Sequence, residues 1–133
     1  MATFQEGVLA RNARLNALNT QLGATSTLKI FSGALPANCG AADPSGTTLC
    51  TITLPATPFA AASGGVMAMT GSWTVSASGT GTAASFRIYD SSSVCQQQGD
   101  VGTSGTAMIL NNTSISSGQT VTVSTYSITA GNA

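Results

Sequence analysis

The chain has 133 residues, enough for one domain with one hydrophobic core, and 42% of them are hydrophobic. Four residues are basic, four are acidic and histidine is absent, so the formal net charge is zero. Four dispersed cations cannot form the basic patch of a nucleic-acid-binding protein, and no apolar run reaches the ~20 residues needed to span a membrane. We therefore expect no nucleic-acid partner and no membrane partner.

The N-terminus lacks the basic-then-apolar pattern of an export signal, which favours a protein made in the cytoplasm. A net charge near zero promotes association in solution. Such a surface suits a subunit of a dense assembly better than a lone soluble enzyme.

Residues 4–22 are expected to form an α-helix. Thr3 and Glu6 have the spacing of a capping box, and Gly23 is suited to end the helix. One stripe of this helix carries Phe4, Val8, Leu15, Leu18 and Leu22, with Arg11 in the remaining place. Two interpretations stay open. The helix packs on the sheet of its own domain, or it is an arm that docks on a neighbouring subunit and offers its arginine to a partner carboxylate or carbonyl.

After the helix, the period of the apolar residues changes from 3.6 to 2, which predicts strands. The expected strands are residues 28–31, 47–54, 66–78, 86–89, 94–98, 108–110 and 120–129. In the last of them the alternation changes phase near Ser124, which indicates a β-bulge. Residues 99–105 are expected to form a loop, and Asp90 is expected to begin a turn.

Two long loops, residues 32–46 and 55–65, are interrupted by prolines. Loops of this length without structure of their own often bind something. The candidate contact residues on them are Leu35, Pro36, Pro58 and Phe59.

A helix followed by many short strands is typical of a mainly β fold, here a β-sandwich or jelly-roll-like barrel with one N-terminal α-helix. We expect a single domain overall, with an N-terminal helix or arm at residues 1–24 and a β-sandwich at residues 25–133.

The sequence offers little catalytic chemistry. Without histidine, neither a Ser–His–Asp nor a Cys–His arrangement can form within the chain. The three aspartates, Asp43, Asp90 and Asp100, are assigned to turns, where their side chains bond the backbone. These observations predict that the protein is not an enzyme, has no cofactor and has no small-molecule substrate.

The cysteines Cys39, Cys50 and Cys95 lack the spacing of metal ligands, so no metal site is expected. Cys39 and Cys50 flank a loop and could be bridged. The preferred interpretation is three small buried hydrophobic residues, because cytoplasmic thiols stay reduced.

Six segments spread over nearly the whole chain carry a resemblance to a known family. They are LKIFSG at 28–33, LPANC at 35–39, LCTITL at 49–54, GTAASFRIYD at 81–90, QGDVGTSG at 98–105 and SISSGQTV at 114–121. Together with the N-terminal helix, they resemble a family of small structural proteins of tailed bacteriophages and prophages, some of which are capsid cement or decoration proteins. These motifs are structural, so the resemblance implies no catalytic residue.

The resemblance implies a β-rich subunit on the exterior of the virion capsid, made in the cytoplasm of the bacterial host. Its partners would be the major capsid protein and itself, as a dimer or trimer at twofold or threefold lattice positions. The helix stripe and the two proline-containing loops are then the candidate contacts. Two alternatives stay open: a tail or head-fibre subunit, and a glycan-binding β-sandwich, which the small number of aromatic residues disfavours.

Overall fold

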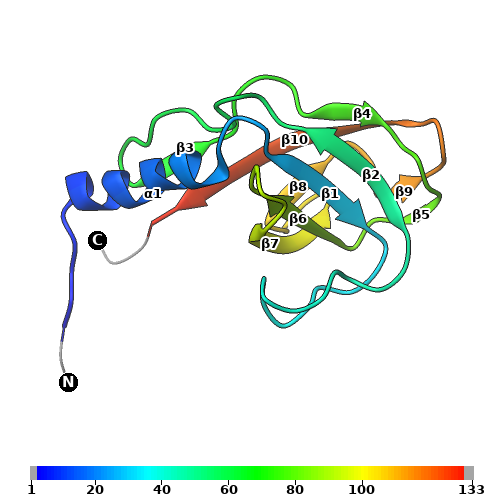
Figure 1. The fold of residues 1–133 in the computed structure, drawn as a ribbon, viewed down its shortest axis with the longest axis horizontal. Coiled ribbons are helices and arrows are strands. Elements are labelled where there is room, and N and C mark those ends of the chain that lie inside the picture. Colours follow the sequence, from blue (N-terminus) through cyan, green and yellow to red (C-terminus); the bar gives the residue numbers. More distant parts are fainter. Residues whose placement is uncertain (1–2, 131–133) are drawn as a thin grey trace.

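A computed structural model describes residues 3–130, which fold into one helix and a curled sheet (Figure 1). Strands make up 39% of the structure and helix 12%, and the sheet curls into a half-barrel. This confirms the predicted mainly β fold with one helix near the N-terminus. The ends of the predicted domain ranges, residues 1–2 and 131–133, lie outside the described residues.

The strands form one large sheet and one small ladder. The elements in chain order are α1 (Val8–Leu22), β1 (Thr27–Phe31), β2 (Thr48–Thr53), β3 (Val66–Ala68), β4 (Thr74–Ser76), β5 (Gly81–Thr82), β6 (Ser85–Tyr89), β7 (Cys95–Gly102), β8 (Met108–Leu110), β9 (Ser114–Ile115) and β10 (Thr120–Thr129). The eight-stranded sheet has the order β2-β1-β6-β7-β8-β10-β3, with β4 also paired to β10, and β5 pairs with β9. The β7–β8 pair is parallel.

Helix α1 begins later than predicted. Its N-cap is Gly7, in an extended conformation and without a side-chain cap, so the capping box of Thr3 and Glu6 is wrong. Glu6 instead forms an ion pair with Arg14 at 3.1 Å. The side chain of Phe4 is 67% exposed. Because this residue has no core to pack against, extending the helix to it would bury little apolar surface.

The end of α1 and its inner face agree with the predicted helix. Gly23 has a positive φ of 77°, and its N–H donates to the carbonyl of Asn19 at 3.2 Å. Leu15 and Leu22 are buried in the main core, and Leu18 packs against it. The helix therefore belongs to the same hydrophobic core as the sheet.

The single strand predicted for residues 66–78 is wrong, because the structure divides it into β3 and β4, which pair with different parts of β10. The N–H of Met69 bonds the carbonyl of Tyr126, and the N–H of Val123 bonds the carbonyl of Trp73. Between these two bonds, the three residues 70–72 lie opposite the two residues 124–125 of β10. Trp73 stands at the end of this interruption, and its indole is fully buried in the core.

Two further features of the strands concern the second half of the chain. The pairing of β10 with β8 shifts register between Val123 and Thr125, which confirms the bulge predicted near Ser124.

The loop predicted for residues 99–105 is wrong at its start, because β7 continues to Gly102. A Cβ at Gly99 would lie 2.7 Å from the ring of Phe86, so glycine occurs there because of close packing between strands.

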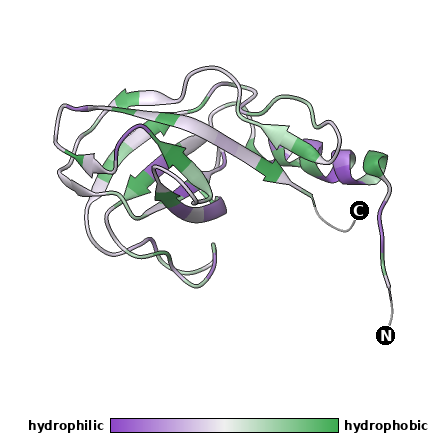
Figure 2. Ribbon diagram, turned by 180° about the vertical axis from the view of Figure 1, so that it is seen from behind, coloured by the Kyte–Doolittle hydropathy of each residue, from purple (hydrophilic) through white to green (hydrophobic). Residues whose placement is uncertain are grey.

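An aromatic cluster forms the centre of the core. Phe59, Trp73, Phe86 and Tyr126 are joined by ring contacts with centroid distances from 5.2 to 6.0 Å. Figure 2 shows hydrophobic residues along most strands, whereas β7, with its three consecutive glutamines, is hydrophilic. This polar strand forms one wall of the site described next.

Candidate functional site

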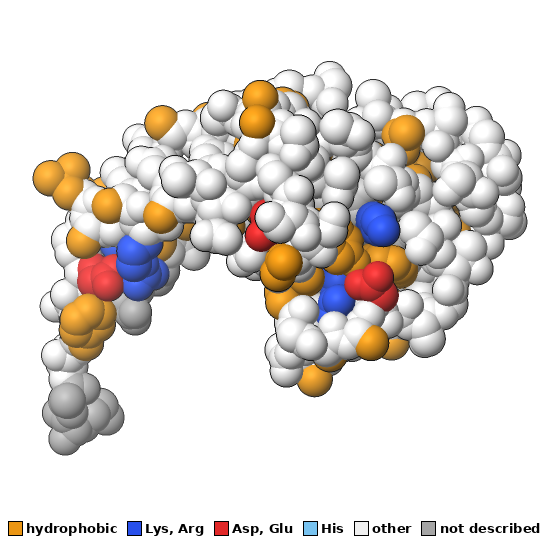
Figure 3. Space-filling model, in the orientation of Figure 1, with side chains coloured by type: hydrophobic (Ala, Val, Ile, Leu, Met, Phe, Trp, Pro, Cys, Tyr) orange, Lys and Arg blue, Asp and Glu red, His pale blue; other side chains and the backbone are white. Residues whose placement is uncertain are grey.

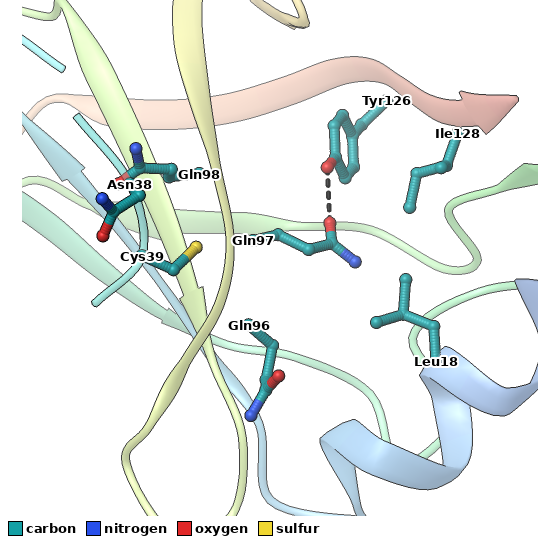
Figure 4. Close-up of a pocket in the computed structure, with 8 residues that line it drawn as sticks. All are labelled: Leu18, Asn38, Cys39, Gln96, Gln97, Gln98, Tyr126 and Ile128. Atoms are coloured by element: carbon teal, nitrogen blue, oxygen red, sulfur yellow. Dashed lines mark hydrogen bonds between the residues drawn. The ribbon is translucent and has the colours of Figure 1, made fainter. Parts of the chain in front are cut away.

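A pocket of about 430 Å³ opens on the hollowed side of the molecule, where α1, the loop 32–47, β7 and β10 meet (Figures 3 and 4). The side chains around it are apolar groups and amides, with one thiol and one phenol. The lining residues are Leu18, Asn38, Cys39, Gln96, Gln97, Gln98, Tyr126 and Ile128. Its volume lies within the roughly 300–1,000 Å³ of small-molecule sites, but no carboxylate or cation lines it.

The amides of the pocket differ in how fully they are bonded. Gln96 donates to Asp90 at 2.9 Å, and Gln98 donates to the carbonyl of Pro36 at 2.8 Å. The Oε1 atom of Gln97 accepts a hydrogen bond from the Tyr126 hydroxyl, but its Nε2 atom is buried without a partner among residues 3–130. This Nε2 atom is a donor that a carbonyl or hydroxyl oxygen in the pocket would satisfy.

The loop 32–47 is held on the sheet by Arg87, whose side chain is 2% exposed. Its guanidinium donates to Asn38 O (3.1 Å), Ala41 O (3.1 Å), Asp43 Oδ1 (3.0 Å) and Gln98 Oε1 (3.1 Å). The predicted strand alternation implied one polar face for β6, but all five of its residues are buried. The loop covers the second face, and the planar guanidinium can bond several oxygens at once.

Asp43 was predicted to bond the backbone within a turn, but in the structure its side chain has a different role. Its Oδ1 atom receives hydrogen bonds from both Arg87 and the hydroxyl of Tyr89. Burial, followed by the hydrogen bond to Asp43, raises the pKa of Tyr89 well above its usual value. The ammonium group of Lys29 lies 5.3 Å from the centre of the Tyr89 ring. The loop and sheet are thus joined by charge as well as by backbone hydrogen bonds.

The three cysteines are free thiols, and Cys39 and Cys50 are not bridged. Cys50 is fully buried on β2, as predicted, and burial raises the pKa of its thiol to about 11. Cys39 and Cys95 are only partly buried, contrary to the predicted burial of all three, and the Cys39 thiol lies beside that of Cys95. Burial and this neighbour together raise the pKa of Cys95 to about 12.

Three large apolar side chains near the N-terminus are exposed, and they are here called the N-terminal surface: Phe4, Val8 and Leu9. Their exposed fractions are 67%, 42% and 80%. Residues 3–7 extend away from the body of the protein (Figure 1). Phe4 lies in this segment and Val8 and Leu9 begin α1, so all three apolar side chains are available for contact with another molecule.

Most of the other predicted contact residues are used by the chain itself. Four predicted interface residues are buried within the subunit itself, so their prediction as contacts is wrong: Leu15, Leu22, Pro58 and Phe59. Phe59 was predicted in an exposed loop, but its ring packs on the other aromatic rings of the core.

The remaining predicted contacts lie at three different places. Leu18 lines the pocket, while Leu35 is 45% exposed and Pro36 is half-buried on the loop 32–47. Arg11 donates to a carbonyl, as foreseen, but this is Ala130 O of its own chain at 3.4 Å rather than a partner's.

Sequence reasoning missed a row of asparagines on α1. Asn12, Asn16 and Asn19 accept hydrogen bonds from the backbone N–H groups of Gly65, Ala62 and Phe59, at 2.9, 2.8 and 3.2 Å. Asn19 also donates to the carbonyl of Phe59 at 2.9 Å. Their spacing of four and three residues places them on one helix face. That spacing was the available signal, and it explains why the loop 55–65 is held against the helix.

The described residues hold no group of three or more His, Cys, Asp or Glu side chains placed to bind a metal ion. No helix among them is long and apolar enough to cross a membrane. No protein-family model, curated protein or solved structure matches the chain.

Proposed function

We propose that this protein is a structural component of a bacteriophage virion, and specifically a cement or decoration protein on the outer surface of the capsid. The observation that carries the proposal is the N-terminal surface: Phe4 is exposed on a segment that leaves the body of the protein, and Val8 and Leu9 are exposed on the first turn of α1. A chain with 6% charged residues has little electrostatic repulsion to keep it apart from neighbours. Both features suit permanent contact with other subunits.

In this proposal the half-barrel is a rigid body, and the N-terminal surface docks on the major capsid protein. Burying one large apolar side chain contributes roughly 1.5–3 kcal/mol, and association itself costs several kcal/mol. A single contact through Phe4 and Leu9 is therefore weak. A dimer or trimer that bridges neighbouring capsid subunits engages several such contacts at once, so that modest affinities add to firm attachment.

The protein would be made in the host cytoplasm and act on the virion exterior without substrate, cofactor or nucleic acid. The absence of histidine supports a role without proton transfer, as does a pocket with no carboxylate. The hydrogen-bonded attachment of the helix and the loop 32–47 supports a body that resists deformation.

The test uses heads of the encoding phage or prophage that lack this protein. The double variant Phe4→Ser/Leu9→Ser is compared with Val94→Ser, which changes a 53% exposed residue outside the N-terminal surface. We expect the double variant to bind heads at least tenfold more weakly and the control to bind normally. Equal binding by both proteins would reject docking through the N-terminal surface. If the unsubstituted protein is a dimer or trimer in solution and the double variant is a monomer, the N-terminal surface instead joins copies of this chain.

Copy number separates this function from a tail or head-fibre subunit. A cement protein is present in hundreds of copies on each particle, and a fibre subunit in far fewer. Quantitative mass spectrometry of purified particles, together with image reconstruction, measures both the number and the position of the copies.

The unpaired Nε2 atom of Gln97 in the pocket favours one second candidate, a glycan-binding module, because sugar hydroxyls would accept from it. A glycan array probed with the protein and with Gln97→Leu tests this. Binding that the variant loses would support the glycan function, and an array without binding would reject it.

A further inference from the structure

Two partly exposed thiols meet where the loop 32–47 crosses the sheet. Arg87 bonds the carbonyl of Asn38, immediately before Cys39, and the carbonyl of Ala41, two residues after it, each at 3.1 Å. These two hydrogen bonds hold the backbone on either side of Cys39 against the sheet. The position of this thiol is therefore determined by the sheet as well as by the loop.

The second thiol belongs to the first residue of β7. Cys95 is paired with Tyr89 of β6, and the hydroxyl of Tyr89 bonds Asp43 of the same loop. The Sγ atom of Cys95 lies 3.4 Å from the carbonyl oxygen of Gln97, a residue that lines the pocket together with Cys39. The Cys39 thiol is close enough to the Cys95 thiol to help raise its pKa.

We propose that Cys39 and Cys95 are a disulfide-forming pair, through which an oxidising small-molecule disulfide covalently joins the loop 32–47 to β7. The pairing differs from the Cys39–Cys50 bridge considered from the sequence. Cys50 is fully buried on β2 and stays a thiol in the folded protein. The proposal concerns a modification site and holds wherever the protein acts.

The reaction takes place in two exchange steps with oxidised glutathione. The Cys39 thiolate, its proton released to water, attacks one sulfur of glutathione disulfide, whose S–S bond breaks and releases one glutathione thiolate. Cys95 then loses its proton to water, attacks the Cys39 sulfur of the mixed disulfide and releases the second glutathione thiolate. In total, two protein thiols are oxidised and one glutathione disulfide is reduced to two thiols.

The environments of the two thiols determine the order of these steps. The Cys39 side chain lines the open pocket, where glutathione can reach it (Figure 4). Burial raises the pKa of Cys95, so at neutral pH this thiol is a weak nucleophile. Once Cys39 is capped, its thiol no longer contributes to raising the pKa of Cys95, and the second step becomes easier.

The experiment uses the full chain, reduced and then incubated with oxidised glutathione at pH 8. Free thiols are alkylated under native conditions, and the disulfides are mapped by mass spectrometry of peptides. We expect a peptide pair joined through Cys39 and Cys95, with Cys50 alkylated only after unfolding. Because the new bond closes a long loop in the unfolded chain, we also expect the melting temperature to rise by about 10 °C.

Variants separate the proposed pair from other outcomes. Cys95→Ser should stop at a glutathione adduct on Cys39 and show no rise in melting temperature, and Cys50→Ala should still form the bond. The mapping of the unsubstituted chain needs no variant to fold. A Cys39–Cys50 bond, disulfide dimers, or a lasting glutathione adduct on the unsubstituted chain would overturn the proposal.

Discussion

The Nη1 atom of Arg87 lies 3.0 Å from the Oδ1 atom of Asp43, so a buried strand cation is paired with a carboxylate 44 residues earlier in the chain. The pair is asymmetric: the side chain of Arg87 is 2% exposed and that of Asp43 is 53% exposed. The guanidinium has been removed from water, and its bonds to the loop compensate for the lost hydration. This relationship determines where the loop 32–47 lies, and with it one wall of the pocket.

Asp43→Asn should lower the free energy of unfolding by about 1–2 kcal/mol, because it removes the charge that compensates Arg87 while keeping an acceptor oxygen. Urea unfolding measures the change. Asp100→Asn is the matched control, because that exposed carboxylate accepts from the backbone N–H of Ala107 at 2.8 Å and forms no ion pair within the described residues. We expect the control to change stability by less than about 0.5 kcal/mol. Equal effects would show that the charge of Asp43 has no special role.

Gly33→Ala should destabilise the protein by about 1–3 kcal/mol, because a Cβ at this position would lie 1.6 Å from the carbonyl oxygen of Ser45 and the backbone would have to move. Gly40→Ala lies in the same loop, and its nearest contact is the flexible Asn38 side chain at 3.2 Å. Thermal unfolding of both variants tests the close approach at Gly33. A variant at Gly33 as stable as the one at Gly40 would contradict it.

Two Phe→Ala substitutions distinguish the core from the N-terminal surface. Phe59→Ala should lower the free energy of unfolding by about 3–5 kcal/mol, because it leaves a cavity beside Trp73 and Tyr126. Phe4→Ala should change it by less than about 0.5 kcal/mol, since that ring is 67% exposed. Chemical denaturation measures both. A large loss of stability from Phe4→Ala would mean that this ring is packed in solution.

Stability should fall as the pH rises from about 9 to about 11. The pKa of Cys50 is raised from 9.0 to about 11 by burial, so over this range the unfolded chain loses the thiol proton while the folded chain keeps it. The raised pKa of Cys95 adds to the loss, and those of Tyr89 and Tyr126 extend it to higher pH. Urea titrations at several pH values should give a shallower decline for Cys50→Ala. Identical pH slopes would contradict the assignment to Cys50.

Local signals in the sequence predicted several features correctly. Gly23 ends the helix because glycine adopts a positive φ without steric cost, and the change of phase near Ser124 marks a bulge because the side-chain period of a strand is two. Asp90 accepts from the N–H groups of Ser92 and Val94, as a turn aspartate does. Each of these depends on only a few neighbouring residues.

Other features follow from contacts between distant segments. Thr3 and Glu6 have the spacing of a helix cap, yet the helix starts at Val8, because Phe4, the large apolar residue before it, is 67% exposed and a longer helix would bury little more apolar surface. Gly99 looks like a loop residue, but lies in a strand against the ring of Phe86. Local propensity is worth only fractions of a kcal/mol per residue, so tertiary packing decides such cases.

The sequence by itself determined the mainly β class, the single N-terminal helix and the scarcity of charge, because these depend on composition and on the period of apolar residues. Only the tertiary structure decided that Arg87 is buried under a loop, that the asparagines of α1 bond the loop 55–65 and that Cys39 lies beside Cys95. These contacts join residues 40 or more positions apart, and the order of neighbouring residues along the chain does not indicate which distant side chains will meet.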